Sequence, residues 1–566
     1  MVVPQQAHSL TISSGAVFGA ALLIQFLGVI GSTFLYKKVG VDAAGIALVG
    51  TAQLFLLIGS SINGVGDLRI GTAYCYFLAR GKSPADNTSV YLAVRTAMVA
   101  MAGLILFVIA PISVDGHVVA GNATDLMSLG LFLLMPILWS FSAVYNNMYI
   151  GLGNSLKAQY PSLVEAICRL PVLLFVAFDV RTLQGITLAY AVGAASSAVF
   201  SFPALYKQFG LLRWAEGLHL FRFAWPLMGS LMLNYLVTNM VPLIVDASLG
   251  TQQLSIFLAA NGWRVLVLSL PAAVTTPLFP YLAGLHRQER FEVLRKSTWQ
   301  ALRYSAMLLV PGVVALVTYR FTFLNVFANH LYAAPGALPL AVLVVSAIPL
   351  ALSQIIQSSI NAIGRQRLEL YITSTQVSVL FVGIAVLMPP WGFLPARDGI
   401  IAGAIAVLGS SIAALGLNTY FMETLIRVHI HPWSIARITL SAAGSFAALS
   451  ELNRTHLFPV HAWYQLLAAV VLGFAVYFVI LALCGELASE DVTRIGAQLG
   501  VQGWLPRMIG RMCWKKTSPD LPPIDLRTAK GLHSTELPEA FSGTTELPTL
   551  EPLDVQGDER PPNGPP

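Results

Sequence analysis

Long apolar runs separated by short polar segments dominate the chain. A run that is to cross a bilayer as a helix must hold about 20 apolar residues at ~1.5 Å rise per residue. Runs of that length predict an all-α polytopic membrane protein with about 14 transmembrane helices, near 11–36, 43–66, 88–112, 124–150, 161–179, 183–206, 223–249, 253–282, 301–319, 336–362, 368–390, 399–424, 433–451 and 462–487.

Two short patterns recur at almost one spacing. Val39-Gly40 and Gly45-Ile46 return as Leu249-Gly250 and Ser255-Ile256, and Ile150-Gly151-Leu152-Gly153-Asn154 returns as Asn361-Ala362-Ile363-Gly364-Arg365. The offsets are 249 − 39 = 210 and 361 − 150 = 211. An even number of helices in each repeat predicts two parallel six-helix bundles related by a pseudo-twofold axis along the membrane normal. We assign residues 1–206 and 207–432 to these bundles.

Four further segments complete the predicted organisation. Residues 433–487 form an extra helix pair, and residues 283–300 form an amphipathic helix between the two bundles. Residues 488–516 mix tryptophan and methionine with arginine and lysine, which predicts a cytoplasmic amphipathic segment that faces anionic lipids. Residues 517–566 are rich in proline and acids, which is typical of a disordered tail.

Composition and charge exclude a soluble domain. Of the 566 residues, 56% are hydrophobic and 11% are charged, and the mean hydropathy is +0.71, whereas soluble domains hold about 25% charged residues. Lys and Arg lie mostly in the loops on the side of the two termini, and the exceptions are Lys37, Lys38, Arg181, Arg397 and Arg454. The positive-inside rule therefore predicts a multi-pass protein of the cell (inner or plasma) membrane with both termini cytoplasmic.

Motifs for catalysis, metal binding or nucleic-acid binding are missing from the sequence. It holds no P-loop, HExxH or GxSxG pattern, and its four cysteines form no CxxC. His429 and His431 stand without carboxylates, so we predict no metal site and no cofactor. Dispersed basic residues argue against nucleic acid as a partner. We therefore expect a protein that is not an enzyme.

Arg264 is the sharpest candidate for a functional residue. It lies near the middle of its apolar run, where a guanidinium costs at least ~2.5–3.5 kcal/mol unless it meets a wet cavity or a partner. We expect it to be a lumenal cation for an anionic substrate such as a diphosphate. The structural alternative is a partner for Asp246 or for helix carbonyl groups.

Other polar residues in the runs are secondary candidates. Asn261, Asn234, Asn239, Gln25 and Gln53 either line the lumen or hydrogen-bond between helices. Asp246 is the candidate site for a coupling proton or cation, with an interfacial position as the alternative. Arg95 either reaches lipid phosphates or meets the substrate headgroup in the lumen. Glu165 and Arg169, spaced i,i+4, are interpreted as a structural pair.

The chain resembles the polysaccharide transporter branch of the multidrug/oligosaccharidyl-lipid/polysaccharide (MOP) exporter superfamily, over about residues 10–500. The resemblance rests on four motifs, namely Phe34-Leu35-Tyr36-Lys37-Lys38-Val39-Gly40 with Gly45-Ile46, Leu278-Phe279-Pro280-Tyr281-Leu282-Ala283, Asn361-Ala362-Ile363-Gly364-Arg365, and Gly485-Glu486-Leu487 with Glu490-Asp491. The resemblance implies a cavity between two six-helix bundles that opens to each side in turn. Peptidoglycan-precursor flippases of this superfamily carry several cavity arginines, and only Arg264 matches one of them here.

These observations favour a flippase. Its substrate would be a polyprenyl-(di)phosphate-linked oligosaccharide, moved from the cytoplasmic to the outer leaflet for cell-surface polysaccharide or glycoconjugate synthesis. Membrane lipids and glycan-assembly enzymes are the candidate partners. One alternative is an ion-coupled multidrug or cation antiporter of the same superfamily, which would need acids deep in the lumen. A second is a membrane glycan polymerase or ligase, which would need a larger external loop.

Overall fold

The structure is a computed structural model. It describes residues 19–20, 23–79, 83–109, 123–152, 154–210, 214–365, 367–388, 392, 395, 398–428, 431–455 and 462–486. The predicted amphipathic segment 488–516 and the predicted tail 517–566 lie outside the described residues.

Every regular element in these residues is a helix. Residues 23–34 are helical and run into η1. The elements that follow are η1 (Leu35–Val39), α2 (Ala43–Val65), α3 (Ile70–Ala79), α4 (Pro84–Ile109), α5 (Ala123–Gly151), α6 (Ser155–Ala158), α7 (Tyr160–Phe175), η2 (Val176–Val180), α8 (Leu183–Tyr206), α9 (Trp214–Leu249), α10 (Thr251–Arg287), α11 (Phe291–Thr318), α12 (Arg320–Phe327), α13 (His330–Ala362), α14 (Arg367–Leu387), α15 (Gly399–Phe421), η4 (Met422–Ile426), α16 (Pro432–Arg454) and α17 (Trp463–Leu483).

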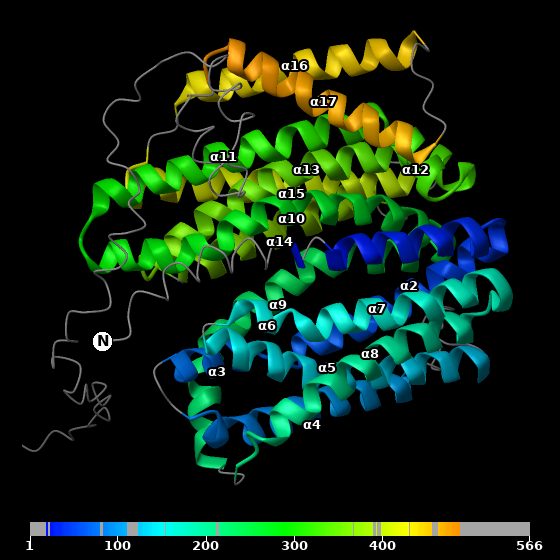
Figure 1. Ribbon diagram of the computed structural model, residues 1–566, viewed down its shortest axis with the longest axis vertical. Coiled ribbons are helices and arrows are strands. Elements are labelled where there is room, and N and C mark those ends of the chain that lie inside the picture. Colours follow the sequence, from blue (N-terminus) through cyan, green and yellow to red (C-terminus); the bar gives the residue numbers. More distant parts are fainter. Residues whose placement is uncertain are drawn as a thin grey trace, which may run out of the picture. The chain divides into compact units, whose positions relative to one another are not determined.

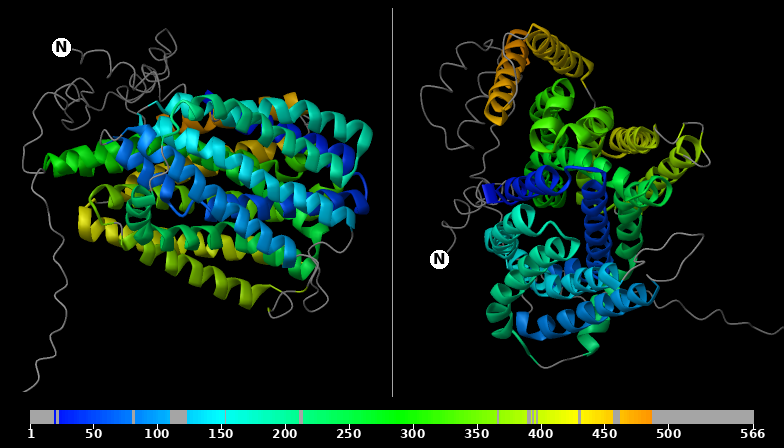
Figure 2. Two further views of the ribbon diagram at one scale, coloured as in Figure 1. Left: turned by 90° about the horizontal axis from the view of Figure 1, so that it is seen from below. Right: turned by 90° about the vertical axis from the view of Figure 1, so that its right-hand side faces the viewer.

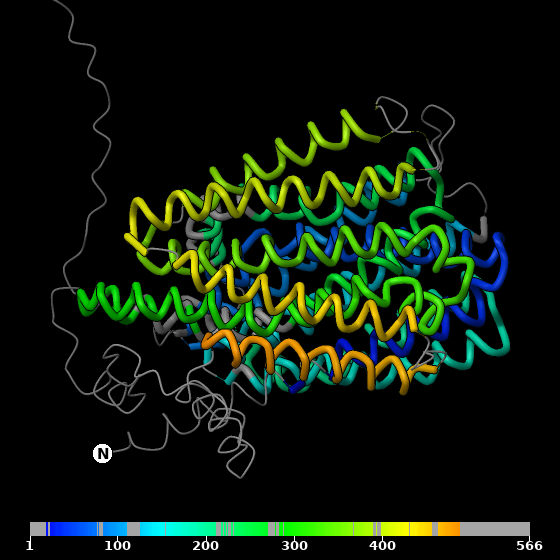
Figure 3. The backbone as a smooth tube through the Cα atoms, turned by 90° about the horizontal axis from the view of Figure 1, so that it is seen from above, coloured from blue at the N-terminus to red at the C-terminus, as the bar shows by residue number. Residues whose placement is uncertain are grey.

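The prediction of an all-helical membrane protein is confirmed for this part of the chain. Within it, 10 helices are long and apolar enough to cross a membrane. Four further predicted spans are not among these ten: three of them correspond to α7, α10 and α16, and the first, near 11–36, is helical over residues 23–34. Figure 3 shows the long helices running side by side in nearly one direction, as a multi-pass membrane protein requires. The full number of spans and the twofold relation of the bundles stay predictions.

The helices pack in two groups, with α9 in contact with both. In the first half of the chain, α5 packs on α4 and α8, and α8 packs on α7; in the second half, α10, α11, α14 and α15 pack around α13 and one another. Helix α9 contacts α2, α3 and α4 of the first group and α10, α14 and α15 of the second. The two groups lie one above the other in Figure 1 and in the right-hand view of Figure 2, and α2 joins them by packing along α10.

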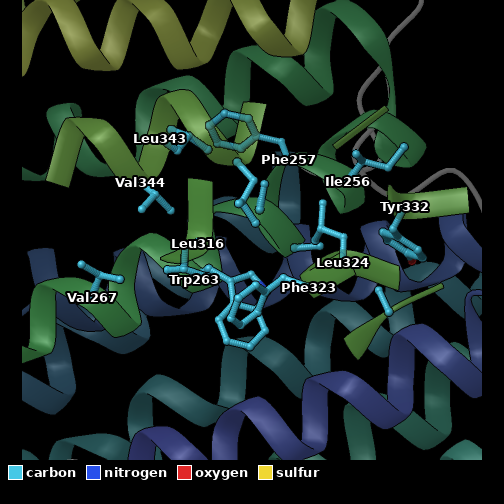
Figure 4. Packing of buried hydrophobic residues seen from close by; sticks show 14 of the residues in the cluster. Ile256, Phe257, Trp263, Val267, Leu316, Phe323, Leu324, Tyr332, Leu343 and Val344 are labelled. Carbon is cyan, nitrogen blue, oxygen red and sulfur yellow. The ribbon is translucent and has the colours of Figure 1, made fainter. Parts of the chain in front are cut away.

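Small residues permit this close packing. On α15 the buried face consists largely of glycine, alanine and serine, including Gly403, Ala404 and Ser410. In a bilayer the helices gain little from leaving lipid, so close van der Waals contact through small side chains stabilises them. Larger apolar residues fill the spaces between α10, α11, α12 and α13 (Figure 4), where Phe257, Leu343 and Val344 are almost fully buried.

Two predictions of loops between helices are wrong. Residues 283–300 are not a separate amphipathic helix, because α10 continues to Arg287 and α11 begins at Phe291. The chain turns between them through Glu289, whose φ is 57°. The turn after Leu249 is also shorter than the gap of residues 250–252 between the predicted runs 223–249 and 253–282. Gly250 alone breaks the helix, with a φ of 87° that glycine adopts without strain.

The buried carboxylate of Glu486 links the last helix pair, α16 and α17, to α11 of the second group. Glu486 is 5% exposed and accepts hydrogen bonds from Arg303 on α11 at 2.8 Å and from Arg437 on α16 at 3.2 Å, with Ser434 on α16 as a further donor. Because Glu486 follows α17, this cluster ties α16 and α17 to α11 at one end.

Candidate functional site

A cavity of about 320 Å³ lies at the seam between the two helix groups. Its first wall comes from the helix before η1 and from α2, α7 and α8, and its second wall comes from α10 and α12. The lining therefore brings together segments far apart in the sequence. Its main side chains are Gln25, Tyr36, Arg169, Tyr190, Trp263 and Phe327.

Arg169 is the charged side chain in the cavity lining. The Nη1 of Arg169 lies 3.4 Å from the Oε1 of Glu165, which is one turn earlier on α7. The Arg169 side chain is 20% exposed and the Glu165 side chain 16%. Trp139 on α5 donates to the second carboxylate oxygen at 3.1 Å. The guanidinium also lies 4.9 Å from the ring centroid of Tyr190 on α8, a cation–π contact. The two side chains form the predicted pair, and Arg169 in addition lines the cavity.

The opposite wall is aromatic and firmly packed. Trp263 on α10 is 9% exposed, and its ring centroid lies 5.0 Å from that of Phe323 and 4.8 Å from that of Phe327. Figure 4 shows Trp263 against Phe323 within the buried apolar cluster. Neither Tyr190 nor Trp263 carried a signal in the sequence, because an aromatic residue in an apolar run is usually a packing residue.

Arg264 lies on a different face of α10 from the cavity. At 3.6 residues per turn it is about 160° around the helix from Gly262, which lines the cavity. Its Nη1 donates to the Asn261 Oδ1 at 3.3 Å, while its buried Nε has no hydrogen-bond partner in the described part of the chain. Asn261 and Arg264 thus form a polar pair in which the described residues supply no carboxylate.

The remaining predicted residues do not gather at the cavity, with Gln25 as the exception. Asn234, Asn239 and Asp246 lie half-buried along α9. Gln53 on α2 donates to the hydroxyl of Tyr36 at 2.6 Å and so links two helices of the first group.

The expectation that Arg95 reaches lipid phosphates does not fit its position. The side chain is 3% exposed and forms an ion pair with Asp67. Arg95 also donates to the Asn63 Oδ1 at 2.8 Å, and Tyr91 donates to Asp67 at 2.6 Å. These contacts form a polar network inside the first group of helices. Asp67 was missed because it lies in the turn after α2 and is 28 residues from its partner.

The two helix groups touch at the end of the seam that carries Arg69, hereafter the Arg69 end. Arg69 lies 4.0 Å from Glu369 on α14, and Asn361 donates to the same carboxylate at 2.8 Å. Tyr235 on α9 packs its hydroxyl directly onto Gly64 of α2. Leu68 and Arg69 both adopt left-handed backbone angles, with φ of 45° and 59°, and such strain often accompanies switch regions.

The groups also touch at the opposite end, hereafter the Asn329 end. The Asn329 side chain donates to the carbonyl oxygens of Tyr36 at 3.1 Å and Gly40 at 2.7 Å, while its own oxygen caps the start of α13. The rings of Tyr36 and Tyr332 pack 5.0 Å apart. Gly50 of α2 meets the backbone of Thr251 at the start of α10. Contacts thus join the groups at both ends of the seam, with the cavity between them.

A model of a known protein family, described as polysaccharide biosynthesis protein, matches residues 86–334. This part of the chain is similar to that family. The matched region runs from α4 into α13 and includes Arg169, Tyr190, Trp263 and Arg264. No curated protein sequence matches the chain.

Solved structures show which fold the chain adopts. The lipid II flippase MurJ in an inward closed conformation aligns at a TM-score of 0.67 and 12% identity, covering 82% of this chain and 98% of that one. A multidrug resistance MATE family transporter of the MOP superfamily, in an inward-facing conformation, aligns at 0.52 and 14%, covering 73% and 94%. A MOP superfamily transporter from Pyrococcus furiosus, described by the reverse polarity of its binding pocket, aligns at 0.52 and 16%, covering 75% and 97%. The chain has a fold like that of MurJ and the MATE transporters.

Proposed function

We propose that the protein is a flippase that moves a polyprenyl-(di)phosphate-linked oligosaccharide from the cytoplasmic to the outer leaflet by alternating access. The observation that carries this proposal is the cavity at the seam of two helix groups, which touch at both of its ends. A seam that can open at one end while closed at the other moves a polar headgroup without exposing it to hydrocarbon. The match to a polysaccharide biosynthesis family supports a glycan as cargo.

Arg264 would hold the phosphate part of the substrate. Its guanidinium is countered only by a neutral amide among the described residues, and an unneutralised arginine is suited to bidentate phosphate binding. Asn234, Asn239 and Gln53 remain secondary candidates for contacts along the path. Asp246 remains the candidate for coupling to a proton or cation.

The orientation follows from the loop charges. Arg69 lies on the basic side of the predicted topology, so the Arg69 end would face the cytoplasm and the Asn329 end the outside. Both termini would then be cytoplasmic in a cell membrane, where glycan-assembly enzymes would supply the substrate.

A multidrug or cation antiporter is the weaker candidate. Recognition of a cationic drug calls for acids in the cavity, and the described lining carries Arg169 with no acid of its own. A glycan polymerase or ligase is weaker still, since the predicted external loops are short.

Translocation of a fluorescent lipid-linked oligosaccharide in proteoliposomes tests the function. We expect wild-type protein to translocate it and Arg264→Ala to slow the rate at least ~tenfold, equivalent to about 1.4 kcal/mol. Arg320→Ala is the matched control, because Arg320 is exposed at the start of α12. Absence of transport by well-folded wild-type protein would contradict the function, and a normal rate for Arg264→Ala would contradict the role of Arg264.

A further inference from the structure

Three basic residues at the Asn329 end lie on the side of the membrane where such residues are rare. Lys37 and Lys38 belong to η1, and Arg181 directly follows η2. The Asn329 side chain donates to the carbonyl oxygen of Gly40, directly after η1, which places these residues at that end of the seam. In the proposed orientation this end faces outside, where the positive-inside rule disfavours lysine and arginine. The three residues, hereafter the outer patch, therefore call for a role on this side.

Packing of η1 against η2 brings the outer patch together. Each of these π-helical segments buries apolar side chains in the core, whereas Lys37 and Arg181 are exposed. The Lys38 Nζ lies 4.9 Å from the centroid of the Phe178 ring on η2, a cation–π contact that joins the two segments. Arg181 has a left-handed φ of 48°. Both π-helical turns and strained residues are frequent at functional sites.

The positive charge of the outer patch is left without ion-pair partners. None of its three side chains forms an ion pair with a carboxylate among the described residues. Two acids lie close in sequence. Asp42 accepts a hydrogen bond from the backbone N–H of Gly45 at 2.7 Å and so caps the start of α2, and Asp179 is exposed on η2. Three cations against two acids leave this surface net positive, which suits an anion.

Exposed apolar side chains next to the outer patch favour a lipid over a soluble anion. Phe175 and Phe178, at the junction of α7 and η2, are 60% and 46% exposed. In a protein that spans a membrane, such rings face hydrocarbon, so an anionic lipid can place its chain beside them and its headgroup at the cations. Tyr36, the residue before Lys37, lines the seam cavity. The outer patch therefore begins where the cavity lining ends.

We propose that Lys37, Lys38 and Arg181 bind the diphosphate of a lipid-linked glycan that has reached the outer leaflet. This inference rests on the proposed function and deepens it by assigning a site to the translocated product. The diphosphate lies at the membrane surface among the three cations, the polyprenyl chain extends into lipid beside Phe175 and Phe178, and the glycan extends into water. The three parts of the product then follow one another across the interface in the order of their covalent bonds.

Titration of the full chain with sugar-free undecaprenyl diphosphate in phosphatidylcholine nanodiscs tests the proposal. An Arg264→Ala background removes the other phosphate-binding residue of the proposed function. Lys37→Gln and Arg181→Gln each remove one exposed cation, Arg181→Lys keeps the charge, and Asp179→Asn removes the exposed acid. Arg454→Gln is the matched control, because Arg454 is an exposed cation at the end of α16, a helix that packs on α11 and α17.

We expect Lys37→Gln and Arg181→Gln each to raise the dissociation constant about fivefold, the effect of one basic residue on an anionic lipid. Asp179→Asn should lower the dissociation constant, because it removes a negative charge beside the cations. Arg181→Lys and Arg454→Gln should leave it unchanged. Undecaprenyl diphosphate should bind more tightly than phosphatidylglycerol, which carries a single phosphate, and inorganic diphosphate at equal concentration should not displace it.

Unchanged dissociation constants in both Lys37→Gln and Arg181→Gln would overturn the inference. Equal affinity for phosphatidylglycerol would contradict a diphosphate as the ligand, and displacement by inorganic diphosphate would contradict a lipid. The proposed function fails by a different result. Binding that depends on the outer patch, in well-folded protein that does not translocate a lipid-linked oligosaccharide, would overturn the flippase and leave the lipid site standing.

Discussion

Gly50→Ala should slow translocation by at least ~fivefold. A Cβ atom at position 50 would overlap the carbonyl oxygen of Thr251, a backbone atom at the start of α10 that cannot rotate away. Helices α2 and α10 would have to separate at the Asn329 end. Overpacking of this kind costs about 1–3 kcal/mol, enough to shift an equilibrium between open and closed states about 5- to 150-fold.

The measurement combines transport with accessibility. Gly262 lines the cavity, and a methyl group added there would have no other atom within 4 Å, so Gly262→Cys is a mild reporter once the four native cysteines are replaced. In the proposed orientation, Gly50→Ala should raise labelling of this cysteine by an impermeant maleimide added outside. Thr251→Ala should not rescue transport, because the overlap is with backbone. Gly416→Ala, which meets nothing within 4 Å, is the matched control. Normal transport by Gly50→Ala would show that close contact of α2 with α10 at the Asn329 end is not required for translocation.

Gly64→Ala should also block transport, by opening the other end of the seam. Here the added methyl group would occupy the position of the Tyr235 hydroxyl. The Tyr235 side chain must therefore move away from α2. We expect the transport rate to fall at least ~tenfold, about 1.4 kcal/mol, and labelling of Gly262→Cys from outside to decrease. The direction is opposite to that of Gly50→Ala because the open end is now cytoplasmic.

A double variant identifies the cause of this effect. If Gly64→Ala acts by displacing Tyr235, then Gly64→Ala/Tyr235→Ala should match Tyr235→Ala alone, since the two changes remove one contact. Transport losses that simply add would mean that Gly64 has another role. Both variants must be compared at equal amounts of folded protein, which size-exclusion chromatography reports.

The apolar pattern was sufficient to predict the helices but not their partners. The run near 161–179 was the least regular because of Glu165 and Arg169, and it is nevertheless helical as α7 and η2, since the two charges neutralise each other within one helix. Helix spacing of i,i+4 is visible in a sequence. The charged loop 283–300 was misread because charge alone does not distinguish a separate surface helix from the ends of two long helices.

The composition of the site depends on contacts that a single sequence does not contain. Arg95 finds Asp67 across 28 positions, and the cavity combines Gln25 with Trp263 from opposite halves of the chain. Nothing local marks these pairs, because they arise only when helices pack. Arg264 could be singled out from the sequence since a cation deep in an apolar run is costly wherever it lies. The sequence could not show whether Arg264 lies on the face of α10 that lines the cavity.

Cross-linking the two helix groups at the Arg69 end tests the central claim most directly. Arg69→Cys and Glu369→Cys replace side chains whose charged atoms lie 4.0 Å apart across the seam, in a background free of the native cysteines, and a cleavable bis-maleimide of matching length joins them. If the halves must separate there to admit a lipid-linked oligosaccharide, cross-linking should stop translocation in proteoliposomes, and cleavage of the linker should restore it. Undiminished translocation by fully cross-linked protein would contradict alternating access across this seam.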